Sequence, residues 1–240
     1  MNTIDKYGDE YTFIKLVEGT LDEYIDDKVK QVGYYTFGFC SSLSNVNLSV
    51  ATSIGSLAFE ECASLKTLNI PNATYVGNMA FQSCHSLEVV DLPEVTTMST
   101  NVFAYCYSLT TANLPKLLEL NGTVFFRCSS LTTVSLPMAT SIGNQAFDNC
   151  ILLGKLSLPK ATKIGYATFS NCRKLSQLYI LASQICTLSS TNAFDSSPIV
   201  ASSYLGYFGS IYVPESLVSA YKTATNWSVF SERITAYTGD

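Results

Sequence analysis

Residues 131–150 read LTTVSLPMATSIGNQAFDNC, and this stretch decides the fold. It opens with a segment in which apolar and polar side chains alternate, so that Val134 and Leu136 lie on the same side of a short strand. Pro137 ends that strand because proline has no N–H to donate to a ladder. Ile142 then predicts a second extended segment whose side chains return to the same core.

The rest of the stretch predicts a turn. Gly143 permits a sharp bend of the backbone, and Ala146, Phe147 and Cys150 have the spacing of one tight helical turn. A single unit of this kind buries only one wall of side chains. It therefore needs stacked neighbours to complete a core.

The same unit recurs with a period of 22 residues. The register is marked by Cys40, Cys62, Cys84, Cys106, Cys128, Cys150 and Cys172. Each of these cysteines has a phenylalanine three residues before it and a leucine three residues after it, whereas the eighth cysteine, Cys186, lies outside the register. Such repetition predicts a solenoid with the recurring side chains in its core. The expected repeat core comprises Phe59, Phe81, Phe103, Phe125, Phe147, Phe169, Cys62, Cys84, Cys106, Cys128, Cys150 and Cys172.

This pattern resembles the BspA-like leucine-rich repeats of bacterial surface proteins over residues 25–200. The tail at 211–222, followed by Asn226, Trp227 and Ser228, is similar to the C-terminal element that often closes such arrays. The resemblance implies a bacterial protein on a cell surface, or a prophage-encoded protein of gut bacteria.

Together these observations predict an α/β repeat solenoid, a right-handed leucine-rich repeat superhelix of about seven to eight coils with a parallel strand ladder. The ladder strands are expected within 65–70, 87–92, 109–114, 131–136 and 153–158. Three segments are expected: an N-terminal lead-in and cap at 1–30, the solenoid at 31–198, and a C-terminal cap of a strand and short helices at 199–240. Asp26 and Asp27 break the pattern of the first coil, which suits the exposed end of an array.

Composition excludes several classes of protein. Hydrophobic residues make up 47% of the chain and charged residues 14%, which favours a packed core over disorder. The net charge of −5 argues against a nucleic-acid partner, and no apolar run reaches the ~18 residues that membrane insertion requires. The N-terminus has no basic segment followed by an apolar one, so no signal peptide is visible. The extracellular or cell-surface location therefore rests on the resemblance, and a phage-associated or cytoplasmic location stays open.

The cysteines allow three interpretations. Zinc sites use closely spaced cysteines and histidines, but the chain has no C-x-x-C pair and only one histidine. Parallel stacking places successive Cα atoms about 4.8 Å apart, within reach of a disulfide, but it holds the Cβ atoms beyond their usual ~3.5–4.5 Å. Buried free thiols are favoured for this reason, and a disulfide between some pair stays open. We expect neither a metal nor a cofactor.

No catalytic constellation is visible in the sequence. His85 has Ser83 and Ser86 beside it, but these residues form no recognisable motif. A nucleophile elbow, a phosphate-binding loop and a dinucleotide fingerprint are all missing. The abundant serines and threonines recur in columns, as side-chain ladders between stacked strands require. The chain is therefore expected not to be an enzyme.

Surface residues provide the functional prediction. The outward strand positions are small and polar in most coils, with Tyr179 as the exception, so the strand face does not resemble a sugar-binding platform. Large residues interrupt otherwise polar columns at Tyr105, Tyr107, Phe126 and Arg127, on adjacent coils. Aromatic residues beside an arginine are typical interface anchors, and we expect these four to form a partner-binding site.

A weaker cluster, Tyr34, Tyr35 and Phe39, lies on the first coil, where packing beneath the N-terminal lead-in would also explain it. The sequence thus predicts a non-catalytic binding or adhesion module that presents a repeat surface to a host or bacterial surface protein or glycan. The alternative is a passive structural spacer or scaffold, such as a cell-surface or phage-tail component. Fold alone does not choose between them, because function depends on sites placed on folds.

Overall fold

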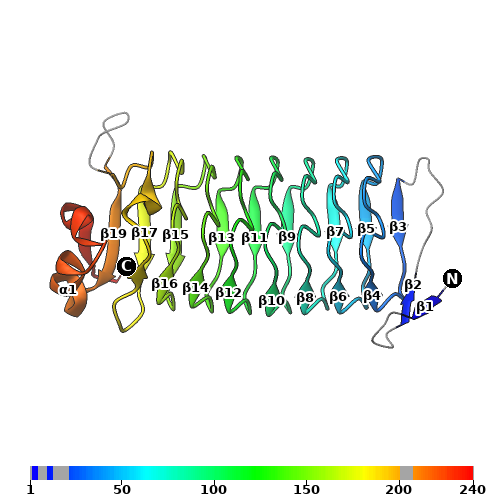
Figure 1. Cartoon of the computed structure of the whole chain (residues 1–240), viewed down its shortest axis with the longest axis horizontal. Coiled ribbons are helices and arrows are strands. Elements are labelled where there is room, and N and C mark those ends of the chain that lie inside the picture. Colours follow the sequence, from blue (N-terminus) through cyan, green and yellow to red (C-terminus); the bar gives the residue numbers. More distant parts are fainter. Residues whose placement is uncertain (1, 5–9, 13–21, 201–207, 240) are drawn as a thin grey trace.

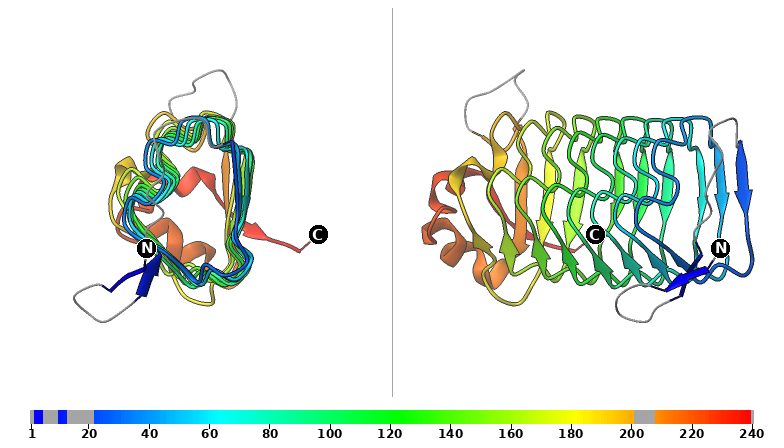
Figure 2. Two further views of the ribbon diagram at one scale, coloured as in Figure 1. Left: turned by 90° about the vertical axis from the view of Figure 1, so that its right-hand side faces the viewer. Right: turned by 45° about the vertical axis from the view of Figure 1, so that its right-hand side comes forward.

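The computed structural model describes residues 2–4, 10–12, 22–200 and 208–239, which form a β-solenoid of about nine turns. Figure 1 shows the turns stacked along one axis, and the end-on view in Figure 2 shows that they superimpose into one outline. The first ladder runs through three hydrogen-bonded sheets and comprises β3 (Glu23–Ile25), β5 (Asn45–Asn47), β7 (Thr67–Asn69), β9 (Val89–Asp91), β11 (Thr111–Asn113), β13 (Thr133–Ser135), β15 (Lys155–Leu158), β17 (Gln177–Ile180), β19 (Ser210–Pro214) and β20 (Ile234–Tyr237). The second comprises β4 (Gln31–Val32), β6 (Ser53–Ile54), β8 (Tyr75–Val76), β10 (Thr97–Met98), β12 (Glu119–Leu120), β14 (Ser141–Ile142), β16 (Lys163–Ile164) and β18 (Thr187–Leu188).

The predicted parallel ladder is confirmed. Ala112 pairs with Val90 on one side and Val134 on the other, a step of 22 residues in each direction. This register places identical repeat positions beside each other throughout the array. The strands are shorter than the predicted segments, because three or four residues span the strand face before the chain turns.

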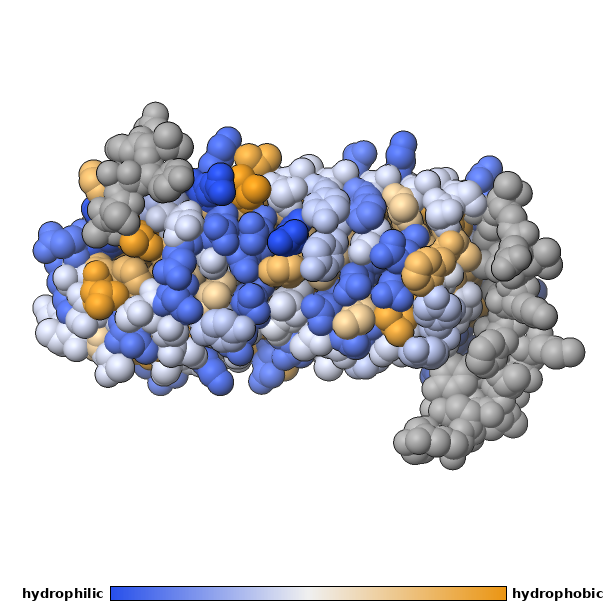
Figure 3. Space-filling model, turned by 45° about the horizontal axis from the view of Figure 1, so that its top comes forward, coloured by the Kyte–Doolittle hydropathy of each residue, from blue (hydrophilic) through white to orange (hydrophobic). Residues whose placement is uncertain are grey.

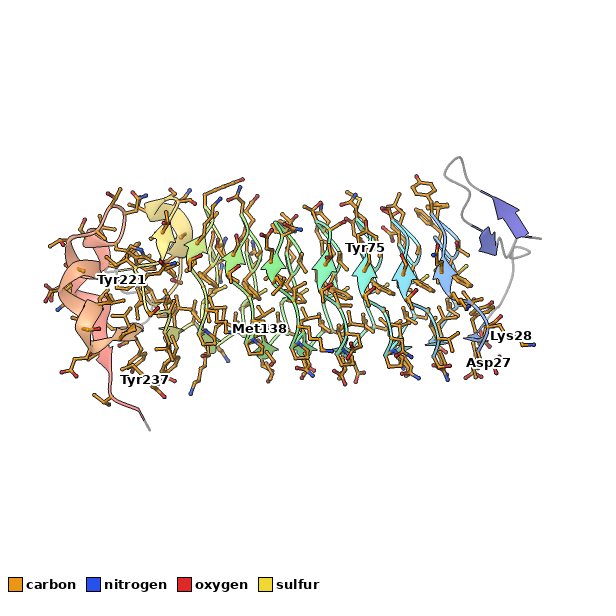
Figure 4. The ribbon with its side chains drawn as sticks, turned by 90° about the horizontal axis from the view of Figure 1, so that it is seen from below. Asp27, Lys28, Tyr75, Met138, Tyr221 and Tyr237 are labelled. Atoms are coloured by element: carbon orange, nitrogen blue, oxygen red, sulfur yellow. The ribbon has the colours of Figure 1, made fainter. Side chains whose placement is uncertain are left out.

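The predicted count of seven to eight coils is too low, because both irregular ends form turns. At the N-terminal end, β3 already pairs in parallel with β5. Asp26 does not break this turn: its Oδ1 accepts the backbone N–H of Lys28 at 2.7 Å and of Val29 at 3.1 Å. Figure 4 shows Asp27 and Lys28 at that end of the stack. At the other end, β19 joins the ladder beyond an insertion. The lead-in before β3 includes β1 (Asn2–Ile4) and β2 (Glu10–Thr12), which pair antiparallel, and most of its other residues lie outside the described ones.

The predicted helical turn in each coil is wrong, and with it the α/β class. The segment around Phe125 is a run of turns in which alternate N–H groups donate to the next coil, while those between them donate three residues back along the chain. Phe125 N donates to Ala146 O at 2.9 Å, and Arg127 N donates to Asp148 O at 2.8 Å. Hydrogen bonds between coils thus interrupt what would be a helical turn, and the array is a β-solenoid.

The column of glycines that contains Gly143 permits close approach between coils, and the bend predicted there does not use a left-handed backbone. The left-handed positions lie elsewhere in each turn and hold residues such as Gln145 (φ 54°) and Asn149 (φ 62°). A Cβ atom on Gly77 would lie 2.5 Å from Ser56 N, and one on Gly143 would lie 2.5 Å from Gly122 N. At these glycines a side chain would clash with the backbone of the preceding coil, whereas Ser99 and Asn121 occupy the same column in the two middle coils.

Replacing Gly77 by alanine should therefore destabilise the array. Overpacking typically costs about 1–3 kcal/mol, and here the clashing atoms belong to backbone, which cannot rotate away. The matched control is Gly154→Ala, whose Cβ would meet nothing closer than Lys174 O at 3.6 Å. Urea unfolding should show a loss for Gly77→Ala and a change within about 0.5 kcal/mol for Gly154→Ala. Equal effects would contradict close approach as the reason for the glycine column.

A stack of phenylalanine rings forms the centre of the core. The rings from Phe37 to Phe194 are at most 1% exposed, and successive centroids lie 4.8–5.8 Å apart with nearly parallel planes. The neighbouring cysteines are free. In six coils the Sγ atom donates a hydrogen bond to the phenylalanine carbonyl of the preceding coil, as Cys106 does to Phe81 O at 3.2 Å. Each thiol thus both fills the core and satisfies a buried carbonyl.

The C-terminal end is closed by short elements, with less helix than the predicted helical cap implies. They are η1 (Thr191–Phe194), η2 (Glu215–Leu217), α1 (Val218–Thr223), η3 (Ser228–Arg233) and β20 (Ile234–Tyr237). Two buried side chains bind the last coil at one residue: Trp227 Nε1 donates to Cys186 O at 2.6 Å, and Tyr221 Oη accepts the Cys186 N–H at 2.7 Å. Asn226 caps no helix; its Nδ2 donates to Leu188 O at 2.8 Å. Figure 4 shows Tyr221 within this end of the molecule.

Candidate binding surface

The structure brings the four predicted site residues together on the turn face, the side of the solenoid formed by the turns that carry the phenylalanines. The Tyr105 and Phe126 rings meet edge to face with centroids 5.4 Å apart, and Tyr107 lies 6.3 Å from Tyr105. The Arg127 guanidinium lies 5.4 Å from the Phe126 centroid and 5.8 Å from that of Tyr105. We call these four residues the turn-face patch.

His85 extends the patch by one residue. Its ring stacks on that of Tyr107 with centroids 5.1 Å apart and an interplanar angle of 25°. In the sequence this histidine belongs to no recognisable motif. The repeat register could have predicted this contact, because His85 and Tyr107 occupy the same repeat position one coil apart.

Two members of the patch have a left-handed backbone. Tyr105 has φ 64° and Arg127 has φ 61°, a region where side chains other than glycine cost about 1–2 kcal/mol. The same repeat position is also left-handed in the other coils, where it holds Phe39, Glu61 and Ser83 earlier in the chain and Asn149 (φ 62°) and Asn171 (φ 58°) later. Asparagine tolerates this conformation better than most residues, so those coils show a less strained solution to the same turn.

The polar residues of the strand face satisfy one another. Asn69 Nδ2 donates to Asn47 Oδ1 at 2.9 Å, and Asn113 Nδ2 donates to Asp91 Oδ1 at 2.9 Å. These bonds run from coil to coil along the ladder, so they stabilise the stack in the way that cross-strand pairs do. Each of these side chains thus already has a partner within the protein.

The C-terminal end of the strand face has an aromatic cluster that the sequence analysis missed. Tyr179 stacks on Tyr212 with centroids 4.6 Å apart, and Tyr237 meets it edge on at 5.7 Å. Lys155 Nζ lies 4.8 Å from the Tyr179 centroid. Tyr212 belongs to β19 and Tyr237 to β20, both beyond the point where the register fails. Periodicity alone therefore could not place them beside Tyr179.

The buried cysteine thiols are held in their protonated, unreactive form. Burial raises the pKa of the Cys106 thiol to about 12, and it raises the pKa of Cys84 and Cys128 well above the ordinary value. A thiol is nucleophilic only as thiolate, so these cysteines are unreactive near neutral pH. In the described part of the chain no three His, Cys, Asp or Glu side chains gather into a possible metal site. Within the same residues no helix has the length and apolar character needed to cross a membrane.

Comparison with known families explains the repeat. The model of the BspA type leucine-rich repeat region matches residues 11–132 and 119–206, with six copies of the repeat. The chain belongs to this family. Leucine-rich repeat proteins typically bind proteins, and the fold is generally non-enzymatic. No curated protein matches the chain.

Solved structures of bacterial leucine-rich repeat proteins share the fold. A leucine-rich cell surface protein from Faecalibacterium prausnitzii has a TM-score of 0.65 at 23% identity, covering 90% of this chain and 69% of that one. The leucine-rich repeat protein of T. pallidum has a TM-score of 0.61 at 24% identity, covering 73% and 87%. One from Bacteroides ovatus has a TM-score of 0.57 at 19% identity, covering 90% and 66%. At these identities the likeness concerns the fold only.

Proposed function

We propose that this BspA-type leucine-rich repeat protein is a non-catalytic binding module that holds a protein partner at the turn-face patch. The observation that supports this most strongly is the left-handed backbone of Tyr105 and Arg127. Bulky side chains at such positions reduce stability, while the asparagines at the same position in later coils avoid most of that cost. A use other than folding, namely binding, explains why these side chains are large.

The chemistry of the patch favours a protein partner over a glycan. Tyrosine and arginine are the residues most enriched at interface hot spots, and rigid aromatic rings lose little entropy on binding. The rings contact each other and Arg127, so their faces are partly covered and do not form a flat platform for a sugar. On the face in Figure 3, apolar residues form small separate patches in a mostly polar surface, which suits a focused protein contact.

A bacterial surface is the proposed location. The relative from F. prausnitzii is described as a cell surface protein, and the family resemblance points the same way. The partner would then be a surface protein of the host or of another bacterium. A passive spacer stays the alternative function.

The test is a paired screen of arrayed extracellular host and bacterial proteins. Wild type is one probe, and the double variant Tyr105→Asn/Arg127→Asn is the other. The true partner should bind the variant about 30-fold less tightly, since loss of one hot-spot anchor typically costs ~2 kcal/mol. Tyr75→Asn, an exposed tyrosine on the second ladder, is the matched control and should bind as wild type does. Partners that bind both probes equally would refute the patch, and a screen without any partner would favour the spacer.

A further inference from the structure

A second exposed aromatic group lies at the N-terminal end of the turn face, apart from the turn-face patch. Tyr34, Tyr35 and Phe39 are 65%, 43% and 60% exposed. The Tyr35 ring lies 6.0 Å from each of the other two rings, so the three form one contiguous surface. We call it the N-terminal aromatic cluster. It lies three coils from Tyr105, which is about 14 Å along the stack.

The position of the Tyr35 ring is fixed by its own turn. A Cβ atom on Gly38 would lie 2.6 Å from this ring, so the aromatic side chain lies directly over glycine backbone. Phe39 N donates to Glu60 O at 2.7 Å, which holds the next coil beside the cluster. The Tyr35 ring and the backbone of Phe39 are thus both held in place within the cluster.

Two carboxylates border this cluster. Glu60 and Glu61 occupy, one coil further on, the repeat positions of Gly38 and Phe39. Partial burial, followed by the charge of Glu61, raises the pKa of Glu60. The Glu60 side chain accepts one hydrogen bond, from Gln82 Nε2 at 3.4 Å. In residues 22–200 and 208–239 the one ion pair joins Lys116 to Glu94, so neither of these carboxylates has a cationic partner there.

The surrounding charge has the same sign. Residues 1–119 contain 14 acidic and 6 basic side chains, whereas residues 120–240 contain 5 acidic and 8 basic ones. The N-terminal half thus has a net charge of −8 and the C-terminal half +3. A cationic partner would be attracted to the end of the solenoid that bears the aromatic cluster.

We propose that the N-terminal aromatic cluster, with Glu60 and Glu61, binds an arginine-bearing segment of a partner protein. An arginine guanidinium is the cation that matches both the aromatic rings and the carboxylates of this surface. Its face stacks on aromatic rings, and its N–H groups pair with carboxylates, whereas the lysine ammonium is a point charge that does less of both. This proposal does not depend on the turn-face patch, because the two surfaces share no residue.

The test is an NMR titration of the full chain, labelled on tyrosine and phenylalanine, with a capped tetra-arginine peptide at low ionic strength. Signals of Tyr35 and Phe39 should shift, and a tetra-lysine peptide should bind more weakly. In the double variant Glu60→Gln/Glu61→Gln the affinity should fall about tenfold. The matched control, Glu88→Gln/Glu119→Gln, removes the same net charge from exposed positions away from the cluster and should retain most of the affinity.

Three results would overturn the proposal. Equal losses in the two double variants would show that the peptide responds to net charge only. Shifts confined to residues outside the cluster would place the peptide elsewhere. A dimer in sedimentation that the Phe39→Asn variant abolishes would assign the surface to a second copy of the chain. Thermal melting of each variant checks that the solenoid is intact, and the Phe39→Asn substitution retains a residue that tolerates the local φ of 61°.

Discussion

Raising the pH from 8 to 11 is expected to unfold the protein as its buried cysteines ionise. Burial raises the pKa of Cys62, Cys106 and Cys186 to about 12, and it raises the pKa of Cys84 and Cys150 well above the ordinary value. A group whose pKa is raised by folding stabilises the folded state fully below its unfolded pKa. That contribution is lost as pH rises from about 9, near the unfolded value, toward 12.

The effect is large because many thiols act together. Each loses about 1.4 kcal/mol for every pH unit above its unfolded pKa until its folded pKa is reached. Several such thiols could remove most of the 5–15 kcal/mol that is typical of a folded domain, so unfolding is expected by about pH 10–11. Urea unfolding at a series of pH values measures the slope.

Alanine substitution separates the thiols from the tyrosines, which also ionise at high pH. In the double variant Cys106→Ala/Cys128→Ala the free energy of unfolding should be lower at pH 7, because two core side chains and two hydrogen bonds are lost. Its decrease between pH 9 and 11 should be shallower than that of wild type. An equal slope in both proteins would show that the cysteines are not protected from water.

Replacing Phe103 by alanine is expected to reduce the free energy of unfolding by about 3–5 kcal/mol. Its ring is fully buried between Phe81 and Phe125, with centroids 5.5 and 5.8 Å away. The cavity cannot close, since the backbones of both neighbouring coils are held by hydrogen bonds to the coil between them. Urea denaturation followed by circular dichroism gives the loss.

Tyr107→Ala is the matched control for this prediction. It removes a ring from the same coil at a position that is 41% exposed, so its cost should be below about 1 kcal/mol. Hydrogen exchange should also show that Phe103→Ala opens the coils around residue 103 before those near the ends, since each coil contacts only its neighbours. Uniform loss of protection along the chain would instead indicate that the array unfolds as one unit.

Periodicity predicts the register of this fold but not the conformation within each unit. The 22-residue spacing of cysteine and phenylalanine determines which positions meet, and the parallel ladder follows from it. The spacing of Ala146, Phe147 and Cys150 fits a helical turn equally well as a sequence pattern. Hydrogen bonds from Phe125 N to Ala146 O belong to the stacked array, and no single unit contains the information for them.

The turn-face patch was visible in the sequence because its members depart from repeat columns. Tyr105 and Arg127 stand where Asn149 and Asn171 occur later, and their proximity follows from the register. The cluster around Tyr179 was not visible, since the insertion before β19 separates Tyr212 from any column. Residues that depart from a repeat pattern can thus be recognised in the sequence only where the repeat is intact.

The most direct test of the account is the free energy of unfolding of Tyr105→Asn compared with Tyr105→Ala and wild type. If Tyr105 is retained for binding, its left-handed backbone, with φ 64°, is a cost in stability. Asparagine should relieve part of that strain, so Tyr105→Asn should equal or exceed wild type in stability. The Tyr105→Ala variant retains most of the strain and loses the ring contacts. Its free energy of unfolding should therefore be lower than that of Tyr105→Asn by about 1 kcal/mol. If Tyr105→Asn were instead less stable than wild type by more than about 1 kcal/mol, Tyr105 would be a structural residue and the central claim would fail.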